Sequence, residues 1–348
     1  MGIREQVPLA PLTTLRLGGP AARLVEARGA EEIVAAVSAA DAAGQPLLLI
    51  GGGSNLVLSD DGWPGTVVVL RGRGVTVAAE GDRRVVTAQA GEPWDELVAR
   101  TVAEGWAGVE CLAGIPGLTG ATPVQNVGAY GQEVSDTIVA VRVWDRDRGE
   151  ARELAAEDCG FGYRHSVFKT TERYVVLEVT FALRAAEKSG PVRYAELARA
   201  LAVEVGGVAP LADVPAAVLA LRRGKGMVVD AADPDTWSVG SFFTNPVLDD
   251  AALAAFEARL DPGATYPSWP AAGGRKLSAA WLIERSGFRQ GYGGDAVRLS
   301  GKHTLALTHR GGGTTAQLLA LAGELRDGVR SRFSVTLEPE PRLVGVRL

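Results

Sequence analysis

The feature that most constrains this chain is a long loop rich in glycine and proline, between stretches of helical and strand composition. Residues 113–131 read AGIPGLTGATPVQNVGAYG, with five glycines, two prolines, one glutamine and one asparagine. Loops this long inside compact domains are usually functional or disordered, and this one carries apolar and aromatic residues and few charges. Glycine allows positive φ and close approach, so the loop predicts a backbone cradle for a ligand, with Gln125 and Asn126 able to pair with a polar heterocycle. An irregular surface loop is the alternative.

A second glycine cluster, GGGSN at residues 51–55, directly follows a short apolar strand expected over 46–50. Three consecutive glycines let backbone N–H groups turn toward an anion such as a pyrophosphate. The cluster is not the GxGxxG fingerprint, because Leu56 stands where the last glycine would be, and no Lys-Ser/Thr pair follows as in a Walker loop. A plain glycine turn explains this segment equally well when it is taken alone.

Composition narrows the class of protein. The chain has 348 residues, 47% of them hydrophobic, and a net charge of −5, and a prior of about 150 residues per domain gives two or three domains. The small negative charge argues against nucleic acid and anionic membranes as partners. Cys111 and Cys159 form neither a CxxC motif nor a zinc framework, so no metal site is expected. The N-terminus lacks the apolar run of a signal peptide and no apolar run is long enough to span a bilayer, which predicts a cytoplasmic protein.

Helical and strand patterns alternate along the chain. The composition predicts helices over 30–43, 93–104, 193–203, 214–223, 278–285 and 314–328. It predicts strands over 46–50, 66–70, 84–90, 138–145, 174–183 and 303–308, and strand character in the tail 332–348. The segment 224–237, rich in Gly, Asp and Pro, is the best candidate for a linker.

Four side chains in three segments suit chemistry but also have ordinary structural explanations. Arg164, in GFGYRHSVFK, is of the type that binds a carboxylate or phosphate with two hydrogen bonds, although any one of many arginines can simply be solvated. Ser241, in GSFFTNP, is outside a GxSxG motif, so it can act only as a proton donor to a very basic carbanion, or else as a turn residue. The LEPEP segment offers Glu338 and Glu340, which a solvated edge would also explain.

Six segments in order resemble one family. They are TTLRLGGPA, GGGSNL, the 113–131 loop, GYRHSVFK, GSFFTNP and LEPEPRLVG, and they run nearly from end to end. Each is weak alone, but together they are similar to the UDP-N-acetylenolpyruvoylglucosamine reductase (UDP-N-acetylmuramate dehydrogenase) family. The length and the YAEL segment around Tyr194 resemble the longer of its two types, which closes a tyrosine loop over the substrate.

The resemblance implies an α+β fold: a two-subdomain FAD-binding fold of the vanillyl-alcohol-oxidase (PCMH) type, followed by a C-terminal α+β substrate-binding domain. The first FAD-binding subdomain would cover 1–70. The second would cover 71–229 and be joined by a C-terminal strand within 330–348. The substrate-binding domain would cover 230–329.

The same resemblance implies FAD and NADPH as cofactors. The residues expected to hold FAD are Gly51, Gly52, Gly53, Ser54, Asn55, Gly114, Ile115, Pro116, Gly117, Gly120, Ala121, Gln125, Asn126, Gly128, Ala129 and Tyr130. The residues expected to contact the substrate are Tyr163, Tyr194, Lys225 and Asn245.

The implied activity is the reduction of UDP-N-acetylglucosamine enolpyruvate to UDP-N-acetylmuramate in peptidoglycan precursor synthesis. Hydride would pass from flavin N5 to the vinyl carbon, after NADPH has reduced the flavin and left. Arg164 would neutralise the substrate carboxylate, a protonated Glu340 would donate to it, and Ser241 would protonate the carbanion. Glu340 is preferred to Glu338 because the family's role falls on the residue after the proline.

Two positions depart from the family pattern. Thr244 stands where many relatives carry lysine, and His309 where they often carry asparagine. Two alternatives stay open: an FAD-linked alcohol or hydroxyacid oxidase of the same fold, and a non-catalytic nucleotide-binding protein. No nucleic acid, membrane or obligate protein partner is expected.

Overall fold

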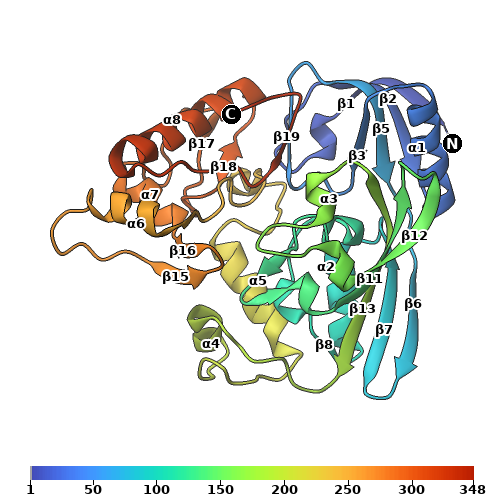
Figure 1. Ribbon diagram of the computed structural model, residues 1–348, viewed down its shortest axis with the longest axis horizontal. Helices are drawn as coiled ribbons and strands as arrows, with labels where there is room; N and C mark the ends of the chain where they lie inside the picture. The colour runs from blue at the N-terminus through green and yellow to red at the C-terminus, as the bar shows by residue number, and fades with distance from the viewer. Residues whose placement is uncertain (1) are drawn as a thin grey trace. The chain divides into compact units, whose positions relative to one another are not determined.

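The computed structural model describes residues 2–348, and Figure 1 shows its ribbon coloured along the chain. Contacts divide the chain into two compact units, each built from segments that are far apart in sequence. The first unit takes the residues up to 7, then 21–53 and 64–228. The second takes residues 8–20, 54–63 and 229–348.

The first unit contains a four-stranded sheet in the order β1-β2-β5-β3. Its strands are β1 (Ile3–Pro8), β2 (Pro20–Ala27), β5 (Trp63–Leu70) and β3 (Leu47–Ile50). β3 and β5 are parallel, and the connection into β3 is the helix α1 (Ala30–Ala42). That helix buries Ile33, Ala36, Val37 and Ala40 at helical spacing, and the chain turns at Gly44, whose φ is +60°.

A larger antiparallel sheet forms the rest of the core of the first unit, in the order β12-β11-β13-β7-β6, with β8 also paired to β13. Figure 1 shows these strands as long cyan and green arrows lying side by side. They are β6 (Val75–Glu80), β7 (Arg83–Gln89), β8 (Trp106–Ala107), β11 (Ile138–Asp145), β12 (Glu150–Ala155) and β13 (Tyr174–Ala185).

Short helices and a small hairpin complete the first unit. They are α2 (Trp94–Ala103), α3 (Val167–Thr170), α4 (Ala195–Ala200), α5 (Asp213–Gly224), β9 (Gly128–Ala129) and β10 (Gln132–Glu133). α2 packs on the sheet through Trp94, whose ring centroid lies 5.8 Å from that of Phe181 on β13. The loop predicted to bind a ligand runs from this helix to the hairpin.

The second unit combines small sheets with three helices. β4 (Leu56–Leu58) pairs in parallel with β19 (Arg342–Val344). The other strands are β14 (Val247–Leu248), β16 (Gly274–Leu277) and β15 (Ser268–Ala271) in one sheet, and β17 (Val297–Leu299) and β18 (Leu307–His309) in another. The helices are α6 (Asp250–Glu257), α7 (Ala279–Arg285) and α8 (Thr315–Phe333). One apolar core joins Phe242, Phe256 and Phe333 with Leu15 and Val57.

The structure corrects two expected strands. The C-terminal strand expected within 330–348 is only Arg342–Val344, and it pairs with β4 rather than with the sheet of residues 71–229. α8 continues to Phe333 because Leu325, Val329 and Phe333, spaced by four, all fall on its buried face. The strand expected over 303–308 begins only at Leu307, since the His303 side chain and backbone accept from Leu305 and Ala306 and hold a turn there. The predicted domain boundaries stay predictions.

Within residues 2–348, no helix combines the length and the apolar character needed to cross a bilayer.

Candidate functional site

The two glycine-rich segments meet backbone to backbone in the first unit. A Cβ built on Gly52 would lie 2.6 Å from Cα of Gly117, and one on Gly51 would lie 3.5 Å from the Leu118 side chain. Real Cβ atoms do not approach that closely, so residue 52 must be glycine for the two loops to touch. The sequence predicted two separate cradles, and the structure packs residues 51–52 of one segment against residues 117–118 of the other; their role in holding a ligand stays a prediction.

Hydrogen bonds fix the loop that faces Gly52. The carbonyl of Gly117 accepts from the Trp94 amide at 3.1 Å, at the start of α2, and the Gly120 amide donates to Ala90 at 2.9 Å. A Cβ on Gly120 would lie 2.4 Å from the Ala90 Cβ. Gly114 has a φ of +72° and donates its amide to the Asp95 carboxylate at 2.6 Å. The loop is therefore ordered, with a shape that depends on glycine at these positions.

Three predicted site residues have strained backbones. Seven non-glycine residues in the described chain have positive φ, and they include Asn126 (+47°), Tyr130 (+51°) and Arg164 (+52°). Asparagine tolerates this region, whereas a tyrosine or an arginine adopts it only when its surroundings impose it. Strain of this kind gathers at functional segments, which supports a role for this part of the chain.

The Asn126 side chain is committed to the protein itself. It is buried, donates to the Glu133 carboxylate at 2.8 Å and to the Gly162 carbonyl at 3.2 Å, and accepts from the Ser135 amide at 3.1 Å. These bonds use both the oxygen and the nitrogen of the amide. Its direct contribution is to shape the loop rather than to pair with a heterocycle.

Arg164 is fastened to the same loop. Its guanidinium donates to the carbonyls of Asn126 at 3.3 Å and Gly128 at 2.9 Å. Two neighbours add hydrogen bonds to the same loop. The Ser166 hydroxyl donates to the Val124 carbonyl at 2.6 Å, and the Gly162 carbonyl accepts from the Asn126 side-chain amide. Four hydrogen bonds thus connect the turn that carries Arg164 to the glycine-rich loop. Tyr163, beside Arg164, is exposed.

Tyr130, Tyr194 and Lys225 come together although they are far apart in sequence. The rings of Tyr130 and Tyr194 meet edge to face, with centroids 6.1 Å apart. The Lys225 ammonium lies 5.8 Å from the Tyr130 ring centroid. Burial raises the pKa of Tyr130, while the Arg222 cation opposes that rise. The Tyr130 phenol is therefore a neutral donor at physiological pH.

Two residues near this cluster were not predicted. Arg222, on the last turn of α5, has a buried Nε with no hydrogen-bond partner in the described part of the chain, and a Cβ on Gly114 would lie 3.5 Å from that atom. Glu196, on α4, accepts from the Lys225 ammonium at 2.5 Å. Neither was visible in the sequence, because a single Arg or Glu on a short helix carries no motif.

These features fit FAD. The glycine contact brings together backbone that carries no Cβ atoms, and the Arg222 Nε, next to Gly114 in the same loop, is a buried donor without a partner in the described residues. A dinucleotide with a pyrophosphate and a polar ring needs both kinds of group. The residues that could hold it are Gly51, Gly52, Gly53, Gly114, Gly117 and Arg222.

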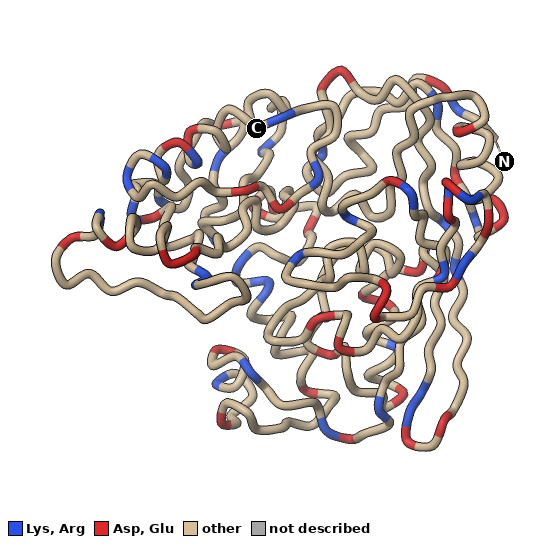
Figure 2. The backbone as a smooth tube through the Cα atoms, in the orientation of Figure 1, with Lys and Arg blue, Asp and Glu red and all other residues tan. Residues whose placement is uncertain are grey.

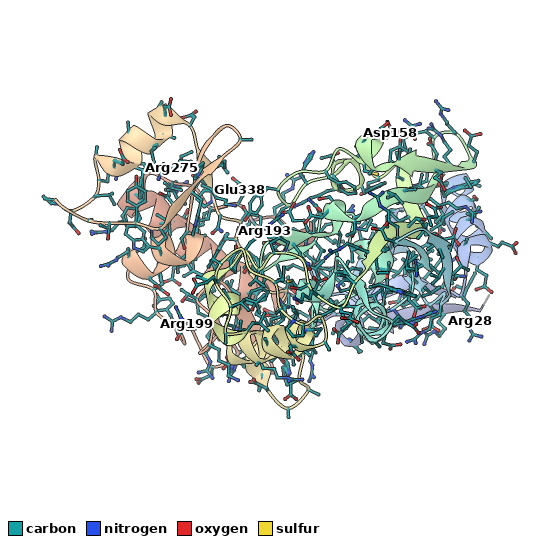
Figure 3. All side chains as sticks on the ribbon, turned by 90° about the horizontal axis from the view of Figure 1, so that it is seen from below. Arg28, Asp158, Arg193, Arg199, Arg275 and Glu338 are labelled. Carbon is teal, nitrogen blue, oxygen red and sulfur yellow. The ribbon has the colours of Figure 1, made fainter. Side chains whose placement is uncertain are left out.

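In the second unit, the backbone brings Ser241 and Glu340 together. The segment 241–244 runs between two others: the Phe242 amide donates to Leu305 at 2.7 Å, and its carbonyl accepts from the Glu340 amide at 2.9 Å. Glu340 is half-buried, whereas Glu338, labelled in Figure 3, is exposed and uses its carbonyl to accept from Thr244. Both glutamates thus lie beside the segment 241–244, and the choice of Glu340 over Glu338 stays a prediction.

The other predicted residues are distributed over both units. Ser54 and Asn55 belong to the second unit, where the Asn55 carbonyl accepts from Arg342, while residues 51–53 belong to the first. Asn245 caps α7 by accepting from the Ala279 amide at 2.9 Å. Arg164 lies in the first unit, and Ser241 and Glu340 lie in the second.

His309, a departure from the family pattern, is a buried structural residue. Its Nδ1 lies 3.1 Å from the Leu15 carbonyl, and its Nε2 accepts from the Gly313 amide at 3.1 Å. Burial lowers its pKa, so the ring is neutral and donates from Nδ1.

Comparison with known proteins places the chain. A family model described as an FAD binding domain matches residues 21–155. Another, described as the C-terminal domain of UDP-N-acetylenolpyruvoylglucosamine reductase, matches residues 233–344. The UDP-N-acetylenolpyruvoylglucosamine reductase of Salinispora arenicola is 57% identical over 345 residues, covering 98% of this chain and 95% of that protein. That of Thermobifida fusca is 55% identical over 350 residues, covering 99% and 98%.

A solved structure gives the same result. The crystal structure of the UDP-N-acetylenolpyruvylglucosamine reductase from Thermus caldophilus aligns with a TM-score of 0.68 at 25% identity, covering 99% of this chain and 100% of that one. These matches confirm the predicted fold class, an α+β chain with an FAD-binding fold. They also confirm the resemblance drawn from the six segments: the chain belongs to the UDP-N-acetylenolpyruvoylglucosamine reductase family.

Proposed function

We propose that this chain is an FAD-dependent enzyme that uses NADPH to reduce UDP-N-acetylglucosamine enolpyruvate to UDP-N-acetylmuramate, a step of peptidoglycan precursor synthesis. The observation that carries the proposal is the contact between Gly52 and Gly117, because it lies within the region that matches an FAD-binding domain. A cytoplasmic location and the tyrosine-loop type belong to the same proposal.

FAD, when bound, supplies the hydride that reduces the carbon–carbon double bond. Gly51, Gly52, Gly53 and Gly117 would hold it through their backbone, whereas the amides of Gly114 and Gly120 already donate to Asp95 and Ala90 and shape the loop. What remains for the side chains of the chain is to bind the substrate, to stabilise the charge that develops on it and to deliver one proton.

Arg164 would neutralise the substrate carboxylate. Addition of a hydride to the vinyl carbon leaves negative charge on the neighbouring carbon and its carboxylate. A cation stabilises that charge best when it is already in place, since no reorganisation is then needed at the moment of reaction. The strained backbone of Arg164 and its bonds to the Asn126 and Gly128 carbonyls supply this fixed position.

Ser241 and Glu340 would complete the reaction. Ser241 transfers its hydroxyl proton to the carbanion carbon, so that a hydride and a proton have been added across the double bond. A hydroxyl is a weak acid, but a carbanion next to a carboxylate is basic enough to take its proton. Glu340 would donate to the carboxylate, and the bond from its amide to Phe242 supports a position next to Ser241.

Tyr194, Lys225, Tyr163 and Asn245 would contact the rest of the substrate. The proximity of Tyr194 and Lys225 around Tyr130 supports the first two. Thr244 stands where the family often carries lysine. Its hydroxyl donates to the Glu338 carbonyl at 3.4 Å.

The proposal is tested by separating the two half-reactions of the FAD-loaded enzyme. Reduction of the flavin by NADPH under anaerobic conditions should bleach its yellow colour, and adding UDP-N-acetylglucosamine enolpyruvate should restore it. In Ser241→Ala, reduction by NADPH should keep its rate while the second step slows by about 10²- to 10⁴-fold, the usual effect of losing a positioned proton donor.

Ser286→Ala is the matched control, because the Ser286 hydroxyl donates to the Leu282 carbonyl at the end of α7. Ser241→Cys should keep part of the activity, since a thiol also donates a proton. Equal slowing of both steps in Ser241→Ala would remove Ser241 from the mechanism. Oxygen consumption with a simple alcohol, and no response to the enolpyruvate, would favour an oxidase instead.

A further inference from the structure

The Lys225 ammonium is held by a carboxylate. Its Nζ donates to Glu196 Oε2 at 2.5 Å and lies 5.8 Å from the Tyr130 ring centroid. Glu196 sits on α4, which begins just after Tyr194, and Lys225 follows α5 directly. The ion pair therefore links two short helices that are joined in sequence only through the loop 201–212.

The sequence on both sides of this pair is rich in arginine. Arg193 and Arg199 flank Glu196 in sequence, and Arg222 and Arg223 precede Lys225. Figure 2 shows this blue stretch at the C-terminal end of α5, and Figure 3 shows Arg193 and Arg199 on either side of α4. Glu196 is the only acidic residue in the segment 192–200. A chain with a net charge of −5 thus has four arginines close in sequence to this pair, and the Asp95 carboxylate acts electrostatically on one of them, Arg222.

We infer that Glu196 occupies the position of a substrate phosphate on Lys225 and must release it when the diphosphate of the substrate binds. Glu196 is a positioning residue, which acts through Lys225 and never on the reacting atoms. This inference rests on the proposed function for the identity of the diphosphate. The inference goes beyond the proposed function because it assigns Glu196 as a competitor for Lys225, which lowers the affinity for the nucleotide.

The exchange is physically easy. The side chains of Lys225 and Glu196 keep 36% and 41% of their surface exposed, and ion pairs exposed to that degree are weak. A diphosphate carries more charge than a carboxylate and gains from the neighbouring arginines as well.

The inference is tested by calorimetric titration of the FAD-loaded full chain with UDP and, separately, with inorganic pyrophosphate. Four forms are compared: the natural sequence, Glu196→Gln, Lys225→Gln and the double variant. Glu196→Gln should bind both ligands about two- to fivefold more tightly, because the competing charge is gone. Lys225→Gln should bind them about tenfold more weakly, and adding Glu196→Gln to it should give no gain.

Steady-state kinetics supplies a second measurement. Glu196→Gln should lower the KM for UDP-N-acetylglucosamine enolpyruvate while the rate of flavin reduction by NADPH stays the same. Glu150→Gln, which removes one exposed charge at the β11–β12 turn, is the control for net charge. Glu196→Ala is a second variant that also removes the carboxylate, should the glutamine amide pair with Lys225.

The inference would be overturned if both Glu196 variants bound UDP no more tightly than the natural sequence does. It would also be overturned if Glu196→Gln raised the affinity for UDP equally with Lys225 and with Gln at position 225. The failure of the proposed function looks different: the enolpyruvate would not reoxidise the reduced flavin in any form, while the pyrophosphate titrations would still rank the variants.

Discussion

At the scale of single residues, the site depends on glycines that lack a Cβ atom as much as on functional side chains. Gly52 and Gly117 touch because neither has a side chain, and Tyr130 and Arg164 keep backbone conformations that their own side chains disfavour. Neighbouring bonds, such as that of Arg164 to Gly128, hold these positions. Substitutions there should therefore change the shape of the loops before they change any chemistry.

Gly52→Ala tests this dependence. The added methyl would lie 2.6 Å from the Gly117 Cα, so one loop has to move. Overpacking of this kind costs about 1–3 kcal/mol, and we expect the purified variant to retain little FAD, measured by its absorbance at 450 nm. Gly190→Ala is the control, because a Cβ on Gly190 would meet nothing within 4 Å. A yellow, fully loaded Gly52→Ala protein would contradict the prediction.

At the scale of elements, one buried carboxylate links three strands. Asp145 ends β11 and is fully buried, and it accepts from Arg173 at 2.7 and 2.6 Å, just before β13, and from Arg152 on β12 at 3.2 Å. Hydrogen bonds from Arg173 first, and from Arg152, hold the pKa of Asp145 well below its usual range. The outer part of the large sheet is thus fastened electrostatically as well as by its backbone ladder.

This coupling gives a pH dependence with a definite sign. Because the pKa of Asp145 is lower in the folded state than in the unfolded chain, its contribution to stability is complete above about pH 5 and is lost as the pH falls below about 4. Asp145→Asn should unfold at lower urea concentration at pH 7, and its midpoint should depend less on pH between 5 and 3. Glu178→Gln, which breaks the more exposed pair with Arg142, should leave the acid dependence unchanged. An unchanged dependence in Asp145→Asn would exclude Asp145 as its source.

Elements with strong local signals could be predicted from the sequence. The helix expected over 30–43 is Ala30–Ala42, because alanine-rich amphipathic spacing and Gly44 define it locally. The prediction of a strand over 332–348 was wrong for its first residues, which belong to α8. Phe333 is buried beside Leu325 and Val329 in a core that the local sequence pattern does not reveal. The same limit applies at the site. Gly52 could be predicted because it lies in a run of three glycines, whereas the positions of Glu196 and Arg222 depend on where α4 and α5 lie.

At the scale of the whole molecule, the second unit cannot be cut out as one continuous piece. It includes residues 8–20 and 54–63, which supply Leu15, Leu17 and Val57 to its core. β4 also supplies the strand partner of β19. The sequence divides into domains near residue 229, but spacing along the chain gives no sign of these two early segments.

The fragment 229–348 should therefore fail to fold alone. Without Leu15, Leu17 and Val57, its core lacks three buried side chains, and the edge of β19 is left unpaired. We expect circular dichroism of the fragment to show no cooperative thermal transition, while the full chain shows one. A sharp transition in the fragment near the melting temperature of the full chain would contradict this view of the second unit.

The parallel pairing of β4 with β19 also bears on how the protein is made. Arg342 follows Leu58 by 284 positions. At a ribosomal rate of about 5–20 residues per second, the nascent β4 waits roughly 15–60 s for its partner strand. During that time Val57 and Leu58 have no apolar cover from the tail, so a ribosome-associated chaperone has a defined early segment to shield. The pairing of β4 with β19 can therefore form only after nearly all of these 348 residues have been made.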